Sequence, residues 1–326
     1  MDSSESSRGS ESARLAVVIN PSKFDDVEAA KSEIQGYLEA GGWAAAAWYE
    51  TTEEDPGEGQ TRQALDDGAT IVASLGGDGT VRAVASVLAG TGVPLALLPC
   101  GTGNLLARNL DVPYDDLQLA VEAMISGVDR RIDTGIVRFS GHTGASTEDR
   151  FLVMAGMGID ADAMANTNET LKARIGWPAY AITGLKELVK AGFRVCLDTP
   201  HEISLIQYAR SVLIGNCGTL TGGIKLMPEA EVDDGVLDGL VVSPSGLVGL
   251  TAIIGDFVTR SRHGHRLMAR RRASEFVVRL SDPNLGEIDG DPVGRFERME
   301  VRCDPQSLTV RVPVPREEKE KEKIDD

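Results

Sequence analysis

The chain has 326 residues and a formal net charge of −17 at pH 7, with 50 acidic and 33 basic side chains. Its length exceeds the usual size of a single core, which predicts two domains, and its acidic balance argues against nucleic acid as a general partner. No apolar run could span a bilayer, and four cysteines without a Cys-x-x-Cys pair argue against a zinc site or disulfide framework and for a reducing, cytoplasmic compartment.

The first part of the sequence alternates between apolar strands and amphipathic helices. Residues 1–13 are rich in Ser and Glu, and we expect a disordered tail there. Strands are then predicted at 15–19, 43–49, 71–75 and 93–98, and helices at 25–40, 61–67 and 115–126. This alternation predicts an α/β domain with three layers, built on a parallel sheet.

After residue 133 the pattern changes to short strands. They are predicted at 151–154, 194–197, 203–208, 211–214, 236–242, 276–280 and 308–312, with one helical insertion at 179–190. Such a series predicts a β-rich, sandwich-like second domain. We place the two domains at 14–132 and 133–314, followed by a charged, disordered tail at 315–326.

A glycine-rich turn joins the third predicted strand to a helix. The strand runs into Gly76-Gly77-Asp78-Gly79, and apolar residues then recur at helical spacing over 81–88. The glycines let a phosphate approach the main chain, and the N–H groups of a helix N-terminus favour negative charge. Asp78 would repel a bare phosphate, so we expect a divalent cation or a hydroxyl group to enter the site as well. A lone Gly-Gly-Asp-Gly is more often a plain turn than a binding site.

A second glycine-rich turn follows the next strand. Pro99-Cys100-Gly101-Thr102-Gly103 separates the strand at 93–98 from a helix that starts at Asn104. Two such turns at the ends of neighbouring parallel strands predict a cleft that holds a polyphosphate from two sides. No G-x-x-x-x-G-K-[ST] motif occurs and the glycines do not follow G-x-G-x-x-G, so neither a P-loop nucleotidase nor a Rossmann dehydrogenase is indicated.

Several segments resemble the catalytic domain of the diacylglycerol kinase and sphingosine kinase family, especially its soluble bacterial members. They are Asn20-Pro21, 75–82, 98–108, 226–238 and 288–291, and the resemblance covers residues 14–314. It implies an ATP-binding domain at 14–132, to which the C-terminal segment often returns in the family, and a lipid- and metal-binding domain at 133–314. NAD kinases and phosphofructokinases share the Gly-Gly-Asp-Gly element, so the two later segments are what favours a lipid kinase.

The resemblance also implies which residues bind ATP, the expected cofactor together with Mg²⁺. They follow the first four strands and are Asn20, Pro21, Ser22, Lys23, Thr51, Thr52, Gly76, Gly77, Asp78, Gly79, Thr80, Val81, Arg82, Gly101, Thr102 and Asn104. The family usually has a glycine a few residues after its Asn-Pro, where this chain has Ser22-Lys23-Phe24. This departure weakens the case for a backbone cradle there, although Lys23 could bind phosphate as a cation. Without the resemblance, Asn20-Pro21 would be interpreted as a strand-terminating turn.

The loop at 226–238 resembles the metal-associated loop of the family. There, magnesium binds an Asp side chain and main-chain carbonyls, which are hard oxygen ligands. Carried over, the metal ligands are the Asp234 side chain and the carbonyls of Glu231 and Val236. Taken alone, Asp233-Asp234-Gly235 is a tight hairpin turn.

The segment Ile288-Asp289-Gly290-Asp291 is also a turn in the first place. In bacterial relatives the acidic residue after this Asp-Gly, most often Glu, is the proton acceptor, so the resemblance implies Asp291 as the general base. Asp78 is the alternative catalytic base, because sphingosine kinases assign acid–base work to the equivalent Asp of Gly-Gly-Asp-Gly.

We therefore predict a lipid kinase that transfers the γ-phosphoryl group of MgATP to a lipid hydroxyl, with diacylglycerol as acceptor and phosphatidate as product. The alternatives are a kinase for a soluble substrate, such as NAD kinase, and a lipid- or nucleotide-binding regulator with little turnover.

The expected partner is a lipid substrate at an anionic membrane surface, reached from the cytoplasm, with no nucleic acid involved and a homodimer left open. Six arginines lie between Arg260 and Arg272, directly after an apolar run at 247–258. Such a segment could rest on an anionic bilayer, and a buried helix that ends in a solvated basic turn explains it equally well.

Overall fold

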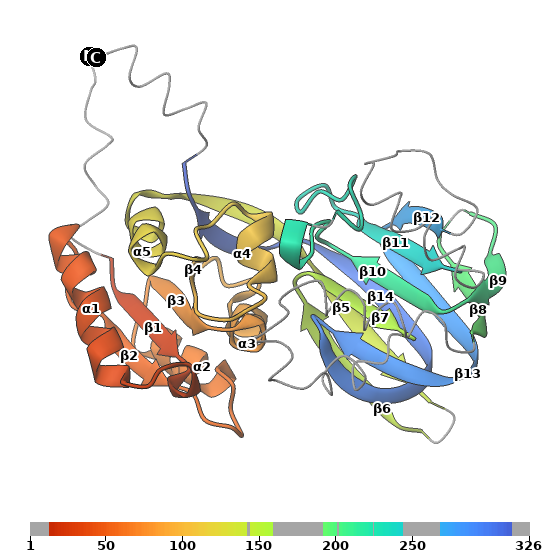
Figure 1. Cartoon of the computed structure of the whole chain (residues 1–326), viewed down its shortest axis with the longest axis horizontal. Coiled ribbons are helices and arrows are strands. Elements are labelled where there is room, and N and C mark those ends of the chain that lie inside the picture. Colours follow the sequence, from red (N-terminus) through yellow and green to blue (C-terminus); the bar gives the residue numbers. More distant parts are fainter. Residues whose placement is uncertain are drawn as a thin grey trace, which may run out of the picture. The chain divides into compact units, whose positions relative to one another are not determined.

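The computed structural model of the chain describes residues 13–141, 144–158, 192–200, 202–223, 225–243 and 268–314. The described residues divide into two units (Figure 1). The first unit comprises those up to Ile132 and those from Gln306 onward, and the second comprises those from Asp133 to Pro305. Each unit has its own hydrophobic core.

A parallel sheet forms the centre of the first unit. Its strands are β1 (Leu15–Ile19), β2 (Ala47–Glu50), β3 (Ile71–Gly76) and β4 (Leu95–Pro99), in the order β2-β1-β3-β4. The end of β14 (Asp291–Val312) lies parallel to β4, with Val310 opposite Leu95. Helices cover both faces of the sheet, so β1, β3 and β4 are buried along nearly their whole length.

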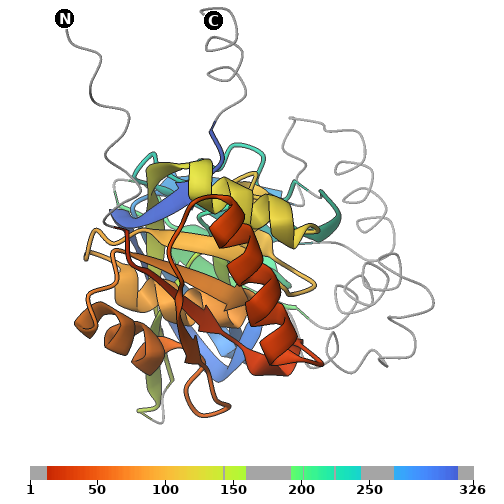
Figure 2. The ribbon, with the colours of Figure 1, turned by 90° about the vertical axis from the view of Figure 1, so that its left-hand side faces the viewer.

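The helices of the first unit form the two outer layers (Figure 2). On one face α1 (Val27–Ala40) packs against α5 (Leu117–Ser126), and on the other α2 (Glu58–Asp66) packs against α3 (Asp78–Leu88). Two shorter helices, η1 (Pro21–Lys23) and α4 (Leu105–Asn109), follow β1 and β4. The helices α1 and α5 begin at Asp26 and Asp116, whose side chains each accept a hydrogen bond from the backbone N–H three residues on.

The second unit is built almost entirely of strands. They are β5 (Val128–Ser140), β6 (Ser146–Phe151), β7 (Met154–Met157), β8 (Phe193–Asp198), β9 (Leu205–Ala209), β10 (Ser211–Gly215), β11 (Leu237–Val242), β12 (Met268–Ala273), β13 (Glu275–Ile288) and most of β14. A short helix η2 (Thr221–Gly223) follows β10. The strands β12, β11, β10, β7, β13 and β14 are successive antiparallel neighbours. In the core, the rings of Phe139 and Phe296 stack with their centroids 5.4 Å apart.

These observations confirm the predicted α/β first domain with a β-rich second domain, but one predicted strand is wrong. The sequence predicts a continuous strand at 151–154, whereas β6 ends at Phe151 and β7 begins at Met154. The reason is that the N–H groups of 152–154 donate to the carboxylate of Asp289, so the chain cannot continue a regular ladder there. The predicted strand at 43–49 is also shorter, since only Ala47–Glu50 pairs with β1.

Two strands were not predicted at all because their sequences are strongly charged. The first residues of β5 are exposed, and β12 contains three consecutive arginines. The predicted helical insertion at 179–190 and the arginines at 260, 262 and 266 lie outside the described residues. Among the helices that are described, none has the length and apolar character needed to cross a membrane.

Candidate functional site

The candidate phosphate site lies where the strands of the first unit end. β1 lies between β2 and β3 in the sheet. The connection that follows β1 therefore runs to one side of it, and the connection that follows β2 runs to the other side. Parallel sheets bind their ligands beside such a change of direction, at the carboxyl ends of the strands. Asn20 follows β1, Gly77 follows β3 and Cys100 follows β4, which places three of the predicted segments at one edge of the sheet.

The first glycine turn presents the N-terminus of α3. Gly77 is the N-cap residue and has no side chain that could cap this helix. The first N–H that bonds inside the helix belongs to Val81, which donates to the Gly77 carbonyl at 3.0 Å, while the Val81 side chain is buried. The N–H groups that precede Val81 therefore belong to the open end of α3, where they and the helix dipole favour an anion.

Gly76 and Gly77 differ in whether the surrounding structure leaves space for a side chain. A Cβ atom on Gly76 would lie 2.7 Å from the Thr80 side chain, so only glycine fits there. A Cβ atom on Gly77 would meet nothing closer than Lys23 Cε at 3.8 Å and Gly101 Cα at 3.9 Å, and its φ of −90° is open to any residue. Gly77 therefore leaves space above the helix N-terminus that the fold itself does not need.

Asp78 connects the two glycine turns. Its carboxylate accepts hydrogen bonds from the backbone N–H groups of Asn104 at 3.0 Å and Leu105 at 2.7 Å, which form the start of α4. The sequence left Asp78 as a carboxylate that needs a cation or a hydroxyl group beside it. In the structure its partners include these two N–H groups, so Asp78 caps α4 and leaves the N-terminus of α3 as the anion site.

The second glycine turn is held by its own side chains as well. Asn104 has a left-handed backbone with φ of 49°, and its amide side chain bonds both the N–H of Gly101 at 3.1 Å and the carbonyl of Gly101 at 2.8 Å. Arg108 donates from Nε to the Gly103 carbonyl at 2.7 Å, and its guanidinium lies 3.7 Å from the ring centre of Tyr114. The exposed Thr102 lies within this fixed turn.

The segment after β1 brings a cation to the glycine turns. Asn20 Oδ1 accepts hydrogen bonds from the N–H and the hydroxyl of Ser22, at 3.0 and 2.7 Å, and Asn20 Nδ2 contacts Thr80 Oγ1 at 3.4 Å. The side chain of Lys23 extends beside Gly77, and its positive charge acts on the thiol of Cys100 in the second turn. Asn20-Pro21 is thus a turn, as its residues suggest, and it also positions Lys23 over both glycine segments.

The remaining predicted ATP ligands lie at the end of β2 and along α3. Thr51 is buried and its N–H donates to the Ile19 carbonyl at 2.9 Å, whereas Thr52 is exposed and its hydroxyl accepts from the N–H of Asp55 at 3.1 Å. Arg82 is half-buried on the second turn of α3.

Gly77→Val should lower the affinity for ATP by at least about tenfold, which corresponds to about 1.4 kcal/mol. The side chain would fill the space above the N-terminus of α3, where its Cβ atom meets nothing closer than 3.8 Å. Isothermal calorimetry measures the affinity, and the melting temperature reports on folding. Gly36→Val is the matched control, because a Cβ atom on Gly36 in α1 meets nothing within 4 Å. An unchanged ATP affinity in a folded Gly77→Val protein would contradict the phosphate site.

In the second unit, the predicted base Asp291 follows a hairpin turn that is held by hydrogen bonds to a distant segment of the chain. Asp289 and Gly290 both have positive φ, at 50° and 90°, and they join Ile288 of β13 to Asp291 of β14 in a two-residue turn. The buried carboxylate of Asp289 accepts three hydrogen bonds of 2.9 to 3.0 Å from the N–H groups of 152–154. The exposed residue Asp291 is therefore presented by a rigid turn.

Glu287 is a buried acid beside this turn that the sequence analysis did not assign to the site. It is 6% exposed, and its Oε1 lies 3.1 Å from the position that a Cβ atom on Gly156 would take. Burial, with the charges of Asp289 and Asp291, raises the pKa of Glu287 to about 7. The burial of Glu287 could not be seen in the sequence, because the alternation of β13 alone does not show that both faces of this strand end are covered.

The predicted metal ligands lie in a turn that precedes β11. Gly235 has φ of 78° and donates its N–H to the buried Asp133 carboxylate at 2.6 Å. Asp234 accepts from the N–H of Val236 at 3.1 Å and forms an ion pair with Arg272. Arg272 also lies 3.5 Å from the carboxylate of Asp238, whose pKa burial raises to about 6.

The oxygen ligands of this loop are of the kind that Mg²⁺ prefers. Arg272 would compete with the ion for the Asp234 carboxylate. Across the described ranges, no three His, Cys, Asp or Glu side chains are grouped as a metal site. The ligand set that the resemblance implies has one carboxylate, that of Asp234, and otherwise depends on the main-chain carbonyls of Glu231 and Val236.

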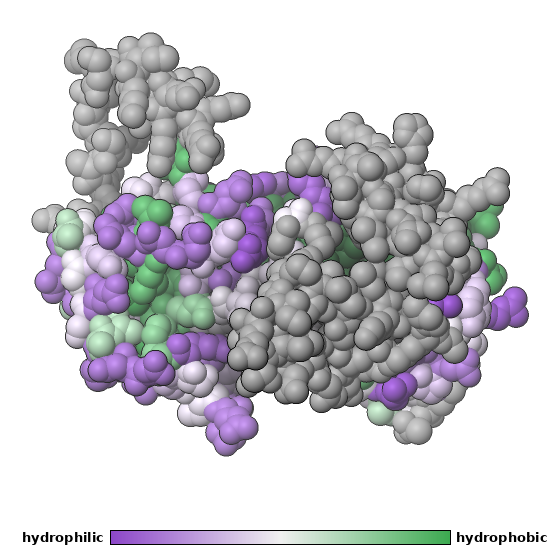
Figure 3. Space-filling model, viewed as in Figure 1, coloured by the Kyte–Doolittle hydropathy of each residue, from purple (hydrophilic) through white to green (hydrophobic). Residues whose placement is uncertain are grey.

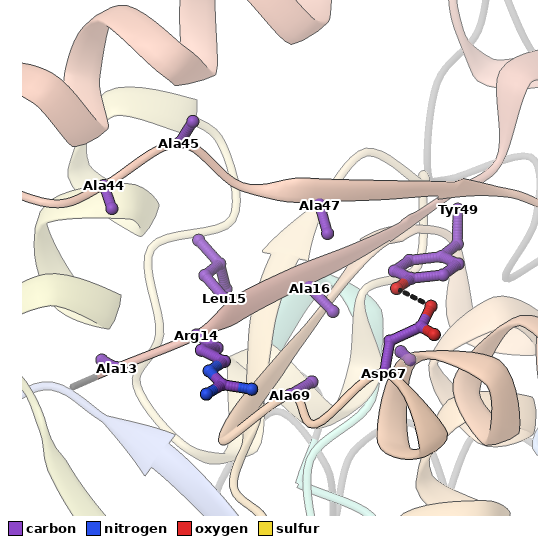
Figure 4. Close-up of a pocket in the computed structure, with 11 residues that line it drawn as sticks. Ala13, Arg14, Leu15, Ala16, Ala44, Ala45, Ala47, Tyr49, Asp67 and Ala69 are labelled. Carbon is purple, nitrogen blue, oxygen red and sulfur yellow. Dashed lines mark hydrogen bonds between the residues drawn. The ribbon is translucent and has the colours of Figure 1, made fainter.

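A separate hollow of about 250 Å³ lies at the opposite edge of the first sheet (Figure 4). Alanines line most of it, and Arg14 lies at its rim. The hydroxyl of Tyr49 donates to Asp67 at 2.7 Å, and burial together with this bond raises the pKa of Tyr49 to about 12. Because it lies by the amino ends of β1 and β2, this hollow does not belong to the phosphate site.

Two family models match the chain. The model described as "Diacylglycerol kinase catalytic domain" matches residues 14–137, and the one described as "YegS C-terminal NAD kinase beta sandwich-like domain" matches residues 152–312. A protein of Pseudomonas aeruginosa (strain UCBPP-PA14) named "Probable lipid kinase YegS-like" is 33% identical over 249 residues, which is 75% of this chain and 77% of that protein. A protein of the same name from Xanthomonas oryzae pv. oryzae (strain MAFF 311018) is 29% identical over 81% of this chain and 85% of its own length.

Solved structures share the fold. A diacylglycerol kinase from Bacillus anthracis str. Sterne superposes with a TM-score of 0.67 at 18% identity, covering 92% of this chain and 96% of that one. Yeast NADH kinase, solved with NADH, superposes with a TM-score of 0.53 at 11% identity, covering 96% and 87%. The fold therefore occurs in kinases of lipids and of dinucleotides.

Proposed function

The chain belongs to the YegS-like lipid kinase family, and we propose that it transfers the γ-phosphoryl group of MgATP to a lipid hydroxyl, with diacylglycerol as the acceptor. The observation that carries this proposal is the open N-terminus of α3 between two glycine turns, with Lys23 beside it. Phosphoryl transfer depends mainly on positioning and on electrostatic stabilisation of the phosphates, and these groups supply both.

The chain's own residues divide the work in the proposed reaction. The N–H groups at the start of α3 and the ammonium group of Lys23 bind the phosphates of ATP, and Asp78, Asn104 and Arg108 hold the turns in place. Asp291 accepts the proton of the lipid hydroxyl as it attacks. Its position directly after a locked two-residue turn supports this role, because a general base must be held at a defined place.

Magnesium is the second proposed cofactor, and one ion would bind the loop of Glu231, Asp234 and Val236. When bound, it would neutralise negative charge in this acidic loop and fix its conformation. The carboxylates of Asp234 and Asp238 both lie beside Arg272, so a cation at this loop would share with its guanidinium the balancing of their charge.

We expect magnesium to raise the melting temperature of the wild-type protein, and Asp234→Ala should abolish this rise. Arg272→Gln should enlarge that rise, because the competing guanidinium is gone and the carboxylates of Asp234 and Asp238 are left for the ion. Calorimetric melting with and without MgCl₂ measures both effects. Arg279→Gln is the matched control, since it breaks a similarly exposed ion pair with Asp198 elsewhere in the same unit. If all variants respond to magnesium like the wild type, this loop binds no metal.

The proposed function is tested by transfer of labelled γ-phosphate from ATP. Diacylglycerol, sphingosine and other hydroxyl lipids are presented in mixed micelles, and NAD is assayed in parallel. We expect label in phosphatidate. Label only in the dinucleotide would instead assign the activity that the likeness to yeast NADH kinase suggests. Absence of label from every acceptor would favour a binding protein, consistent with Ser22-Lys23-Phe24 in place of a glycine-containing segment.

A further inference from the structure

The strand β9 forms an edge of the second unit and turns apolar side chains to the solvent. Among the described strands it pairs only with β8, and its exposed and less exposed residues alternate. Leu205 and Ala209 pack on the core side, whereas Ile206 and Tyr208 point outward. An exposed apolar edge strand invites association with another surface.

Exposure of large apolar residues is concentrated at this place. Ile203, Ile206 and Tyr208 are 91%, 64% and 57% exposed, and no other large apolar side chain of the described residues exceeds 47%. We call these three residues the β9 patch. In Figure 3, hydrophobic atoms reach the surface at the end of the second unit where Figure 1 places β9.

The β9 patch is held in place by its surroundings. The Tyr208 ring lies across Gly192, where a Cβ atom would come within 2.5 Å of it. Glu202, directly before Ile203, forms an ion pair of 2.7 Å with Arg271 of β12. Apolar side chains on a fixed surface lose little conformational freedom when they insert into another phase.

Basic side chains border the patch. Arg194 is exposed and lies directly opposite Tyr208 on β8. Cys196 of β8 lies opposite Ile206 of β9 on one side and opposite Arg279 of β13 on the other. Arg279 forms an ion pair with Asp198, so Arg194 is the side chain that supplies positive charge beside the patch, and anionic headgroups are complementary to it.

We propose that the β9 patch docks the protein on an anionic lipid bilayer, with Ile203, Ile206 and Tyr208 inserted at the headgroup level and Arg194 against the lipid phosphates. This rests on the proposed lipid kinase function, since a lipid substrate is held in a membrane. Isoleucine and tyrosine beside arginine suit the interface of a bilayer. A second copy of the chain on the same surface would instead bring like charges together.

The sequence suggested another membrane surface, the basic cluster between Arg260 and Arg272, of whose arginines the structure describes Arg270, Arg271 and Arg272. Arg271 and Arg272 of the predicted basic cluster form ion pairs with Glu202, Asp234 and Asp238, and the Arg270 Nε atom is buried. In the described chain, Arg271 and Arg272 are thus engaged in ion pairs within the second unit, and the outward-facing cation beside the patch is Arg194.

The test compares vesicle binding of the full chain and of a variant with Ile203→Thr, Ile206→Thr and Tyr208→Thr. Threonine removes apolar surface and keeps the strand propensity of the two positions in β9. Sedimentation with vesicles of phosphatidylcholine and phosphatidylglycerol, without ATP, should show binding reduced by about 100-fold, since partial insertion of each side chain is worth up to about tenfold. Arg194→Gln should weaken binding to these vesicles and leave binding to pure phosphatidylcholine unchanged.

The control variant carries Leu119→Gln and Val128→Thr, which remove the two most exposed large apolar side chains of the described first unit, at 47% and 40% exposure. It should bind vesicles like the wild type. Equal loss in the control, or equal binding by the patch variant, overturns the proposal. The proposal is also overturned if light scattering shows a dimer for the wild type and a monomer for the patch variant, because the patch would then join two copies.

Transfer to a short-chain diacylglycerol in solution should be normal in the patch variant. If the wild type also lacks that activity, the proposed kinase function is contradicted, whereas the vesicle experiment still tests the docking surface.

Discussion

Asp291→Asn is expected to lower turnover by about 10² to 10⁴ while ATP affinity stays nearly constant, because general-base assistance is worth that much. Asparagine has the shape of aspartate, and the site is exposed at the start of β14, so no packing is lost. The turn before it is held by Asp289 and is left intact. Steady-state assays with diacylglycerol give the turnover, and calorimetry gives the affinity for ATP.

Three further variants separate the base from its neighbours. Asp291→Glu should keep substantial activity, since a carboxylate one methylene longer can still accept the proton. Asp282→Asn, at another exposed aspartate of the same strand pair, should leave turnover unchanged. Asp78→Asn should weaken ATP binding, because an amide has one acceptor oxygen where the N–H groups of Asn104 and Leu105 each bond a separate carboxylate oxygen. Near-normal turnover of Asp291→Asn would move the base role to Asp78 or Glu287.

Glu287→Gln is expected to stabilise the protein at pH 8 by up to about 3 kcal/mol and to leave it nearly unchanged at pH 4. The pKa of Glu287 is raised from 4.5 to about 7 in the folded chain, mainly by burial. Between these values the folded protein keeps a proton that the unfolded chain has released, so wild-type stability falls as pH rises through this window. Glutamine is neutral at every pH and removes this loss.

Melting temperatures measured from pH 4 to pH 8 check this expectation. The difference between Glu287→Gln and the wild type should grow as pH rises to about 7 and then level off. Glu275→Gln, which changes an exposed glutamate at the other end of β13, is the matched control. A Glu287→Gln difference that is constant with pH would mean that Glu287 is charged like a surface residue.

The strands and helices of the first unit could largely be predicted because the signal for each one lies within its own segment of sequence. Buried parallel strands are apolar along their whole length, α1 and α5 carry a periodic inner face after an aspartate cap, and glycine turns mark the strand ends. The role of Asp78 was not predictable, because its partners are 26 and 27 residues away and are backbone N–H groups that any residue could supply.

The second unit shows the same limit more strongly. Asp289-Gly290 was interpreted correctly as a tight turn, since both residues must take positive φ and Asp-Gly tolerates this. Its carboxylate, however, meets N–H groups 135 to 137 residues earlier in the chain, and this contact also breaks the strand that was predicted at 151–154. Likewise, the sequence did not show that Arg271 and Arg272 form ion pairs with Glu202 and Asp234, because these acidic partners come from distant segments.

The side chains that fix the glycine turns have a consequence for the entropy of nucleotide binding. Loops rich in glycine lose much conformational freedom when they order around a ligand. Here Asn20, Asp78, Asn104 and Arg108 already hold both turns, so that loss belongs to the folding of the first unit. ATP should accordingly bind a surface that is already formed, and the amide hydrogens of Asn104 and Leu105 should exchange with solvent equally slowly whether ATP is present or not.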